Sequence, residues 1–220
     1  MASKLVRTFV ESLAKKVDMT LRDASSTYAG KTEKIAKEDP RLLQIYDEED
    51  IGSAIYNSRT GQSNLGVVDP QRFLDMAAYL PVDKKGYDYI RGVIDEKKQD
   101  IAQGVPRKQY TFPSLGMRLE DDGLKVNWHD GRHINTAMKE MGYSKGLVEI
   151  APQYKTPDLK TLPPETPVFS EEGFVDDVKI PSKQVGTLGE LVKFLGLAGV
   201  AAPGALSQLT DNQEGGKVVE

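Results

Sequence analysis

The feature that most constrains the fold of this chain is a change of hydrophobic period between residues 124 and 142. Residues 124–129 alternate apolar and polar side chains, which predicts a half-buried strand. Residues 134–141 then repeat apolar side chains every three or four positions, which predicts a helix with one apolar face. Asp130–His133, read Asp-Gly-Arg-His, lies where the two patterns meet. A chain with this pattern joins a strand directly to a helix.

The surrounding residues extend this pattern into an α+β domain over residues 65–151. Asp69 followed by Pro70 is typical of a helix start, because Asp caps free backbone amides and Pro suits the first helical position. The predicted order is strand, two helices, strand, strand, helix, strand. The other predicted elements are strand Leu65–Val68, helix Tyr87–Gln103, an interrupted strand over residues 112–119, a turn at Asp121–Gly123 and strand Leu147–Ile150.

Residues 1–64 are predicted to form a helical and irregular N-terminal segment. Apolar residues spaced by four predict an amphipathic helix within the first thirty residues, and the poorer pattern from Tyr28 to Asn64 predicts short helices and loops. The helix either packs on its own domain or another copy, or docks on a partner or membrane surface. Its apolar face comprises Leu5, Phe9, Leu13 and Val17.

Residues 152–220 change character again. Five prolines between Pro152 and Asp177 predict an extended arm that lies over a surface. The uncharged, Ala- and Gly-rich run Phe194–Leu206 is shorter than the roughly 20 residues of a transmembrane helix. We expect this tail to dock on a partner or on the domain, with membrane contact as the alternative.

Composition excludes several functions. The chain has no cysteine, so disulfides and thiolate chemistry are absent. The N-terminus lacks the uninterrupted apolar region of a secretory signal. A net charge of −4 provides no overall basic field for nucleic acid, so any such contact needs a local patch. The candidate patch is Lys84, Lys85, Lys97, Lys98, Arg107 and Lys108.

The Asp130–His133 junction supports two interpretations. A helix start carries unpartnered N–H groups and positive potential. Gly131 allows close approach, and Arg132 and His133 add donors, which together suit a phosphate. In the alternative, Asp130 caps the helix, Gly131 makes the turn and Arg132 pairs with a carboxylate.

Metal binding and nucleophilic catalysis are weaker hypotheses. His129, Asp130 and His133 are potential ligands, but a strand-to-helix boundary separates the histidines and no third ligand stands at helical spacing. Ser114 and Ser144 are nucleophiles by residue type alone. The neighbouring acids at 121–122 and 171–172 are typical of solvated turns.

Residues Val67–Ile150 resemble the ParB/sulfiredoxin-like domain, whose (D/E)GRHR signature opens a helix before a last strand. The matching pieces are Val68–Pro70, Ile101–Gly104, Phe112–Pro113, Asp130–His133, Ala137, Met141–Gly142 and Leu147–Ile150. The resemblance implies that Asp130, Gly131, Arg132 and His133 bind a nucleotide phosphate. The second arginine of the signature is replaced by Ile134, which removes a phosphate donor. The sulfiredoxin cysteine and a clear match to the acidic residue of the free-serine kinase are also absent.

The segment Asp69–Ala77 before this signature is similar to domains of bacteriophage proteins. The resemblance implies a structural or interaction component of a virion, internal or ejected with the genome, located in the virion or in the cytoplasm of an infected bacterium. Its expected partners are virion proteins or copies of itself, bound through Leu5–Val17 and Phe194–Leu206, and no cofactor is expected. The alternatives are a CTP- or ATP-binding ParB-type protein that binds or cleaves DNA, and a small phosphotransferase. The absence of a recognisable acid–base pair disfavours an enzyme.

Overall fold

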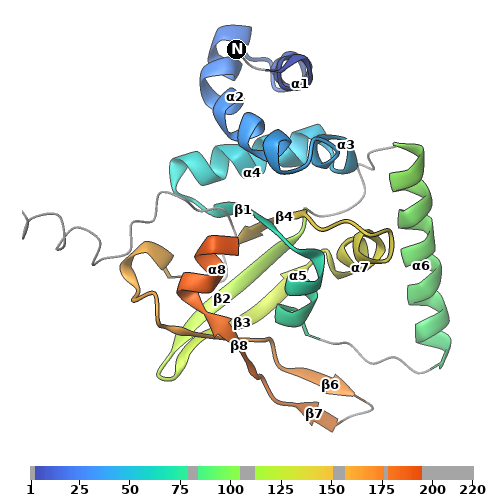
Figure 1. The fold of residues 1–220 in the computed structure, drawn as a ribbon, viewed down its shortest axis with the longest axis vertical. Coiled ribbons are helices and arrows are strands. Elements are labelled where there is room, and N and C mark those ends of the chain that lie inside the picture. The colour runs from blue at the N-terminus through green and yellow to red at the C-terminus, as the bar shows by residue number, and fades with distance from the viewer. Residues whose placement is uncertain (1–2, 79–83, 105–111, 151–156, 176–177, 195–220) are drawn as a thin grey trace, which may run out of the picture.

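The computed structural model describes residues 3–78, 84–104, 112–150, 157–175 and 178–194 (Figure 1). The helices are α1 Lys4–Lys16, α2 Leu21–Glu38, α3 Leu42–Ile45, α4 Glu48–Thr60, α5 Pro70–Met76, α6 Lys84–Gln103, α7 Arg132–Glu140, the 3-10 turn Leu159–Thr161 and α8 Leu188–Phe194. The strands are β1 Asn64–Val68, β2 Ser114–Glu120, β3 Gly123–Asp130, β4 Gly146–Ile150, β5 Pro167–Phe169, β6 Gly173–Val175, β7 Val178–Ile180 and β8 Gln184–Thr187. Helices and strands are mixed, as the α+β prediction required.

Six strands form one sheet in the order β1-β4-β2-β3-β5-β8, and β6 pairs with β7 in a separate ribbon. The β1–β4, β2–β3 and β5–β8 pairs are antiparallel, whereas β4–β2 and β3–β5 are parallel. The predicted turn at Asp121–Gly123 joins β2 to β3 as a hairpin. In Figure 1 the β6–β7 ribbon extends from the end of the sheet opposite the N-terminal helices.

The two faces of the sheet bury different clusters, because successive side chains of a strand point to opposite faces. On β1, Leu65 and Val67 join a core with α1–α4, whereas Val68 joins a second core with α5 and α8. On β4, Leu147 belongs to the first core, and Val148 and Ile150 belong to the second. The sheet thus separates a helical layer from a smaller core.

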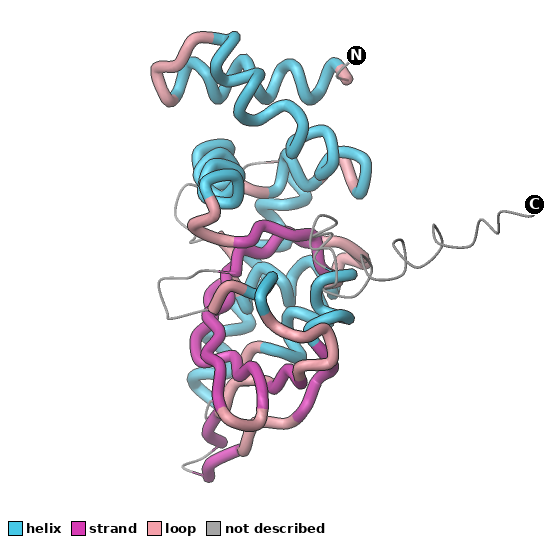
Figure 2. The backbone as a smooth tube through the Cα atoms, turned by 90° about the vertical axis from the view of Figure 1, so that its left-hand side faces the viewer, coloured by secondary structure: helices cyan, strands magenta, loops and turns pink. Residues whose placement is uncertain are grey.

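The N-terminal helices form a layer at one end of the molecule (Figures 1 and 2). The prediction of one helix within the first thirty residues was wrong in its extent. Helix α1 ends at Lys16, Asp18 has φ of 52°, and the Thr20 side chain caps a second helix by accepting from Asp23 N. Val17, predicted on the apolar face, is 39% exposed beyond the end of α1. Residues 28–64 are also more helical than predicted, since α2 and α4 have 18 and 13 residues.

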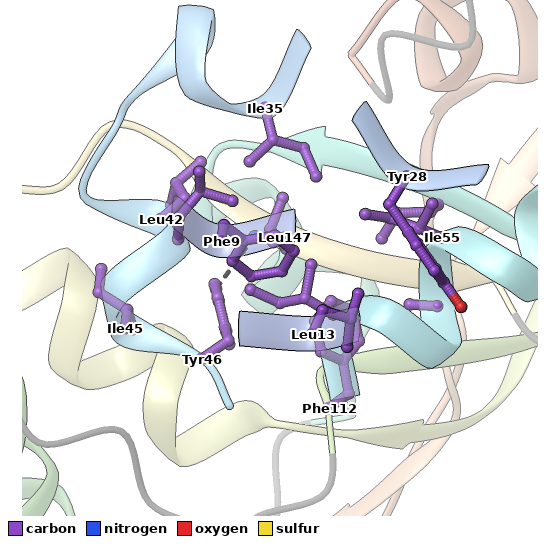
Figure 3. Close-up of a cluster of buried hydrophobic side chains, with 14 of the residues drawn as sticks. Phe9, Leu13, Tyr28, Ile35, Leu42, Ile45, Tyr46, Ile55, Phe112 and Leu147 are labelled. Atoms are coloured by element: carbon purple, nitrogen blue, oxygen red, sulfur yellow. Dashed lines mark hydrogen bonds between the residues drawn. The ribbon is translucent and has the colours of Figure 1, made fainter. Parts of the chain in front are cut away.

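Tyr46 joins this layer to the sheet (Figure 3). Its ring packs against Phe112 with centroids 5.3 Å apart, and its hydroxyl accepts a hydrogen bond from Leu147 N at 3.0 Å. The hydroxyl also contacts Met138 Sδ of α7 at 3.3 Å. Burial raises the pKa of Tyr46, so the hydroxyl stays protonated. One side chain thereby fixes α3, β4 and α7 together.

Residues 157–194 differ from the extended arm that the prolines predicted. Val168 of β5 lies opposite Leu124 of β3 in a parallel pairing, and β8 adds an antiparallel neighbour to β5. Leu159, Val168, Leu188 and Leu191 are buried in the second core. The physical reason is that β3 offers an edge to which the short strand β5 pairs, with Pro167 at its first position, and β8 then pairs with β5. Residues 152–156 lie outside the described residues.

The predicted elements on either side of the junction are confirmed. Asp69 caps α5 by accepting from Gln71 N at 2.8 Å and Arg72 N at 3.2 Å, with Pro70 at the first helical position. Helix α7 buries Ile134, Ala137 and Met138, as the period of three and four indicated. The change of hydrophobic period therefore predicted the positions of β3 and α7 correctly.

Candidate functional site

The junction between β3 and α7 turns at Gly131. This residue has φ of 89° and ψ of 16°, a left-handed conformation that favours glycine. A Cβ built at this position would lie 2.7 Å from both Cα and Cβ of Pro113. The close approach that the sequence assigned to Gly131 is therefore made to the chain's own backbone, at the start of β2.

Asp130 does not cap α7. Its Oδ1 accepts from Gly131 N at 2.6 Å, and the N-cap position is held by Gly131, which makes no side-chain cap hydrogen bond. Asn135 instead donates to Gly131 O through its backbone at 3.1 Å and its side chain at 2.9 Å. The interpretation of Asp130 as the helix cap is wrong, because its carboxylate accepts from the amide of Gly131, the residue that precedes the first helical residue.

Arg132 donates to backbone carbonyl groups. Its Nη1 lies 3.0 Å from Ala77 O and 2.7 Å from Ala78 O. Both carbonyls belong to the segment that follows α5. The guanidinium thus joins the first residue of α7 to a segment 54 residues earlier in the chain.

His133 lies in a cationic environment. Burial lowers the pKa of His133, and the nearby charges of Lys97 and Arg132 lower it further, against a smaller opposing effect of Asp130. The imidazole is therefore neutral at pH 7. Lys97, on α6, is only 5% exposed. A neutral His133 contributes a hydrogen-bonding group to the junction but no charge.

Ile134 occupies the position of the second arginine in the resembled signature. It is 9% exposed and belongs to the first core, with Met138 one turn later. A side chain that points into an apolar core cannot reach an anion at the surface. The departure noted in the sequence therefore has a packing role in this chain.

His129 pairs with an acid that sequence reasoning did not select. Its Nδ1 forms a short contact with Glu171 Oε2, and the two side chains are 12% and 19% exposed. Glu171 lies 42 residues away, before β6, and only the tertiary structure brings it to β3. No local pattern signals this pair, since Glu171 and Glu172 are typical of a solvated turn.

The metal and nucleophile hypotheses gain no support. Within the part of the chain that the structure describes, no group of three or more His, Asp or Glu side chains could hold a metal ion. Ser114 is buried in β2 opposite Asp130, and Ser144 lies exposed before β4. Among the described residues, neither serine is hydrogen-bonded to a histidine.

The predicted basic patch is not assembled by the residues that can be placed. Lys97 is buried, and Lys98 pairs with Glu140 at 3.1 Å and Asp95 at 3.6 Å. The side chains of Lys84 and Lys85, and all of Arg107 and Lys108, lie outside the described residues. A DNA-binding surface therefore has no support from the two lysines that can be placed.

Of the two predicted docking segments, the structure describes α1 but not the tail. The apolar face of α1 is covered by the chain's own core, with Val6 and Leu13 at 0% exposure and Phe9 at 3%. The tail Phe194–Leu206 lies outside the described residues, apart from the backbone of Phe194 at the end of α8. No helix in the described ranges is long and apolar enough to cross a membrane.

Comparisons of this chain with models of protein families, with curated proteins and with solved structures find no match. The ParB/sulfiredoxin-like resemblance therefore stays a prediction that rests on the motifs quoted above.

Proposed function

We propose that this chain is a structural or interaction protein in which the Asp130–His133 junction has a role in architecture rather than in chemistry. The observation that carries the proposal is the engagement of Arg132, whose guanidinium donates to Ala77 O and Ala78 O. Backbone carbonyls thereby occupy Nη1, one of the nitrogens with which a guanidinium would bind a phosphate.

The charges around the junction favour the same proposal. Burial and neighbouring cations keep His133 neutral, and Ile134 contributes packing in place of a second guanidinium. The Asp130 carboxylate stands beside the turn and repels an anion. Lys97, one of the cations that lower the pKa of His133, is itself buried.

A bacteriophage virion is the setting we propose for this protein, internal to the particle or ejected with the genome. This part of the proposal rests on the resemblance of Asp69–Ala77 and of the Asp-Gly-Arg-His signature to phage domains. The chain's own core covers the apolar face of α1. A partner would therefore bind the tail or an exposed face of the protein. Mass spectrometry of purified particles tests the setting, and absence of the chain from them would contradict it.

A nucleotide titration tests the proposed role of the junction. We expect no saturable binding of CTP or ATP to the wild-type protein at about 1 mM, a concentration at which binding energies of about 4 kcal/mol are detected. We also expect Arg132→Ala to lower the free energy of unfolding by about 1.5–3 kcal/mol, since it removes hydrogen bonds from a charged donor. Arg7→Ala, on the exposed side of α1, is the matched control and should change stability by less than about 0.5 kcal/mol.

A nucleotide-binding ParB-type protein is the second candidate. The observation that favours it is the start of α7, where Gly131 stands at the N-cap position and makes no side-chain cap hydrogen bond. The amides of a helix start, together with Arg132, suit a phosphate group. Saturable binding of CTP or ATP that is lost in Arg132→Ala would establish this candidate and overturn the architectural proposal.

A further inference from the structure

Helix α6 packs beside α7 at the edge of the molecule (Figure 1). Among its described side chains, the buried ones are Ile94 and Lys97, at 4% and 5% exposure. Residues three apart lie on the same face of a helix, so Ile94 and Lys97 share the inner face of α6. Tyr89 of the same helix is 72% exposed. A lysine thus lies within the packed surface of α6.

His133 lies on the face of α7 that is turned toward α6. Glu140 marks this face, because its carboxylate accepts from Arg91 at 2.6 Å and from Lys98 at 3.1 Å, both on α6. His133 precedes Glu140 by about two helical turns, so the two side chains project from the same side of α7. The imidazole is half-buried. The contact between α6 and α7 therefore has ion pairs at one end and a histidine toward the other.

The charges that act on His133 are mostly positive. Burial lowers the pKa of His133 most, and Lys97 of α6 and Arg132 of α7 lower it further. On β3, Asp130 raises this pKa and His129 lowers it. The charged groups of α5, which also packs on α7, are not among these; they are Arg72 and Asp75. A proton on His133 is therefore shielded from water and surrounded by like charges.

Helix α7 is more firmly fixed in the fold than α6. Ile134 and Met138 of α7 belong to the first core. Of the described residues of α6, Ile101 alone packs against that core, and it is only partly buried. Unfavourable charge between the two helices is therefore relieved with least loss of packing by a movement of α6.

We propose that the contact between α6 and α7 is acid-sensitive, because a proton on His133 places a second positive charge beside the buried Lys97 and loosens the packing of α6 on α7. Separation of the helices lets water solvate both cations and exposes the face of α7 that α6 covers. The inference goes beyond the proposed function and does not depend on it.

The direction and size of the effect follow from linkage. The pKa of His133 is below its ordinary value of 6.5 in the packed state, so this state binds fewer protons than an open state with an exposed imidazole. His133 leaves the packing unaffected above about pH 6.5 and weakens it as the pH falls further. Each pH unit raises the ratio of open to packed molecules by up to about tenfold, which gives at most about 30-fold between pH 7.5 and pH 5.

The reactivity of a single thiol measures this opening. The chain has no cysteine, so Ile94→Cys places a unique thiol on the buried face of α6. Its rate of reaction with dithiodipyridine in the full chain is divided by the rate for an unstructured cysteine peptide at the same pH, because the thiolate fraction itself depends on pH. Leu13→Cys, in the first core, is the matched control for opening of the whole fold.

We expect the normalised rate at Ile94→Cys to rise by at least about threefold from pH 7.5 to pH 5. Addition of His133→Gln, which cannot take up a proton, should abolish the rise, whereas His129→Gln should retain it. A smaller rise, a rise that persists in His133→Gln or one that requires His129 overturns the inference. An equal rise at Leu13→Cys also overturns it, since the whole fold would then be opening.

Hydrogen exchange provides a second measurement if Ile94→Cys or His133→Gln does not fold. In the unmodified chain, exchange of the α6 amides is followed over the same pH range and corrected for the intrinsic exchange rate. We expect protection of α6 to fall toward pH 5 by more than the protection of α1. Equal changes in the two helices would overturn the inference.

Discussion

Substitution of Gly131 by alanine tests how closely the junction is packed. An L-residue at φ of 89° costs about 1–2 kcal/mol relative to glycine. The added Cβ would also lie 2.7 Å from Cα and Cβ of Pro113, a contact that requires backbone movement. Overpacking of this kind costs about 1–3 kcal/mol. Gly131→Ala should therefore lower the free energy of unfolding by about 2–5 kcal/mol.

Gly61→Ala separates the two contributions. Gly61 follows α4 with φ of 76°, and a Cβ there would meet nothing within 4 Å. This control should lose only the backbone contribution of about 1–2 kcal/mol. Urea unfolding followed by circular dichroism measures both variants, with unchanged m-values as the check that the unfolding transition is comparable. Equal losses in the two variants, within about 0.5 kcal/mol, would refute the argument that Pro113 limits the space at the junction.

Two further predictions concern the ion pairs of Glu140 and the packing of Leu13. Arg91 and Lys98 hold the pKa of Glu140 at about 2, below its usual range. Their ion pairs therefore stabilise the fold above the unfolded pKa of about 4.5 and lose this contribution as the pH falls toward 2. Because these side chains are about one-third exposed, Glu140→Gln should cost about 1 kcal/mol at pH 7 and nothing near pH 2; an equal cost at both pH values would contradict this. Leu13→Ala should cost about 2–5 kcal/mol in thermal or urea unfolding, since Leu13 is fully buried, whereas Leu21→Ala, at a position 47% exposed, should cost less than about 1 kcal/mol.

The hydrophobic periods of the sequence determined the centre of the fold. The alternation over residues 124–129 and the spacing of Ile134, Ala137 and Met138 predicted β3 and α7, because local geometry alone sets the face of a strand or helix on which each side chain lies. The Asp69–Pro70 pair predicted the start of α5 for the same reason. In each case a short-range rule, capping or period, is sufficient.

Local patterns were insufficient where distant segments decide the structure. The prolines between Pro152 and Asp177 predicted an extended arm, and only the open edge of β3 allows part of this region to pair as β5, which β8 then joins. Helix α2 was underestimated because its buried positions have helical spacing but include the small Ala24 and the polar Thr32 beside Tyr28 and Ile35, so the apolar period is hard to recognise in the sequence.

In the candidate site, too, the local turn was predictable and the distant contacts were not. The sequence by itself determined that Gly131 makes a turn between a strand and a helix, and that Arg132 and His133 lie at the helix start. It could not determine what those side chains contact, because Ala77, Ala78 and Glu171 are separated from the junction by 42 to 55 residues. Tertiary packing alone decides that Arg132 donates to the backbone and that Glu171 pairs with His129.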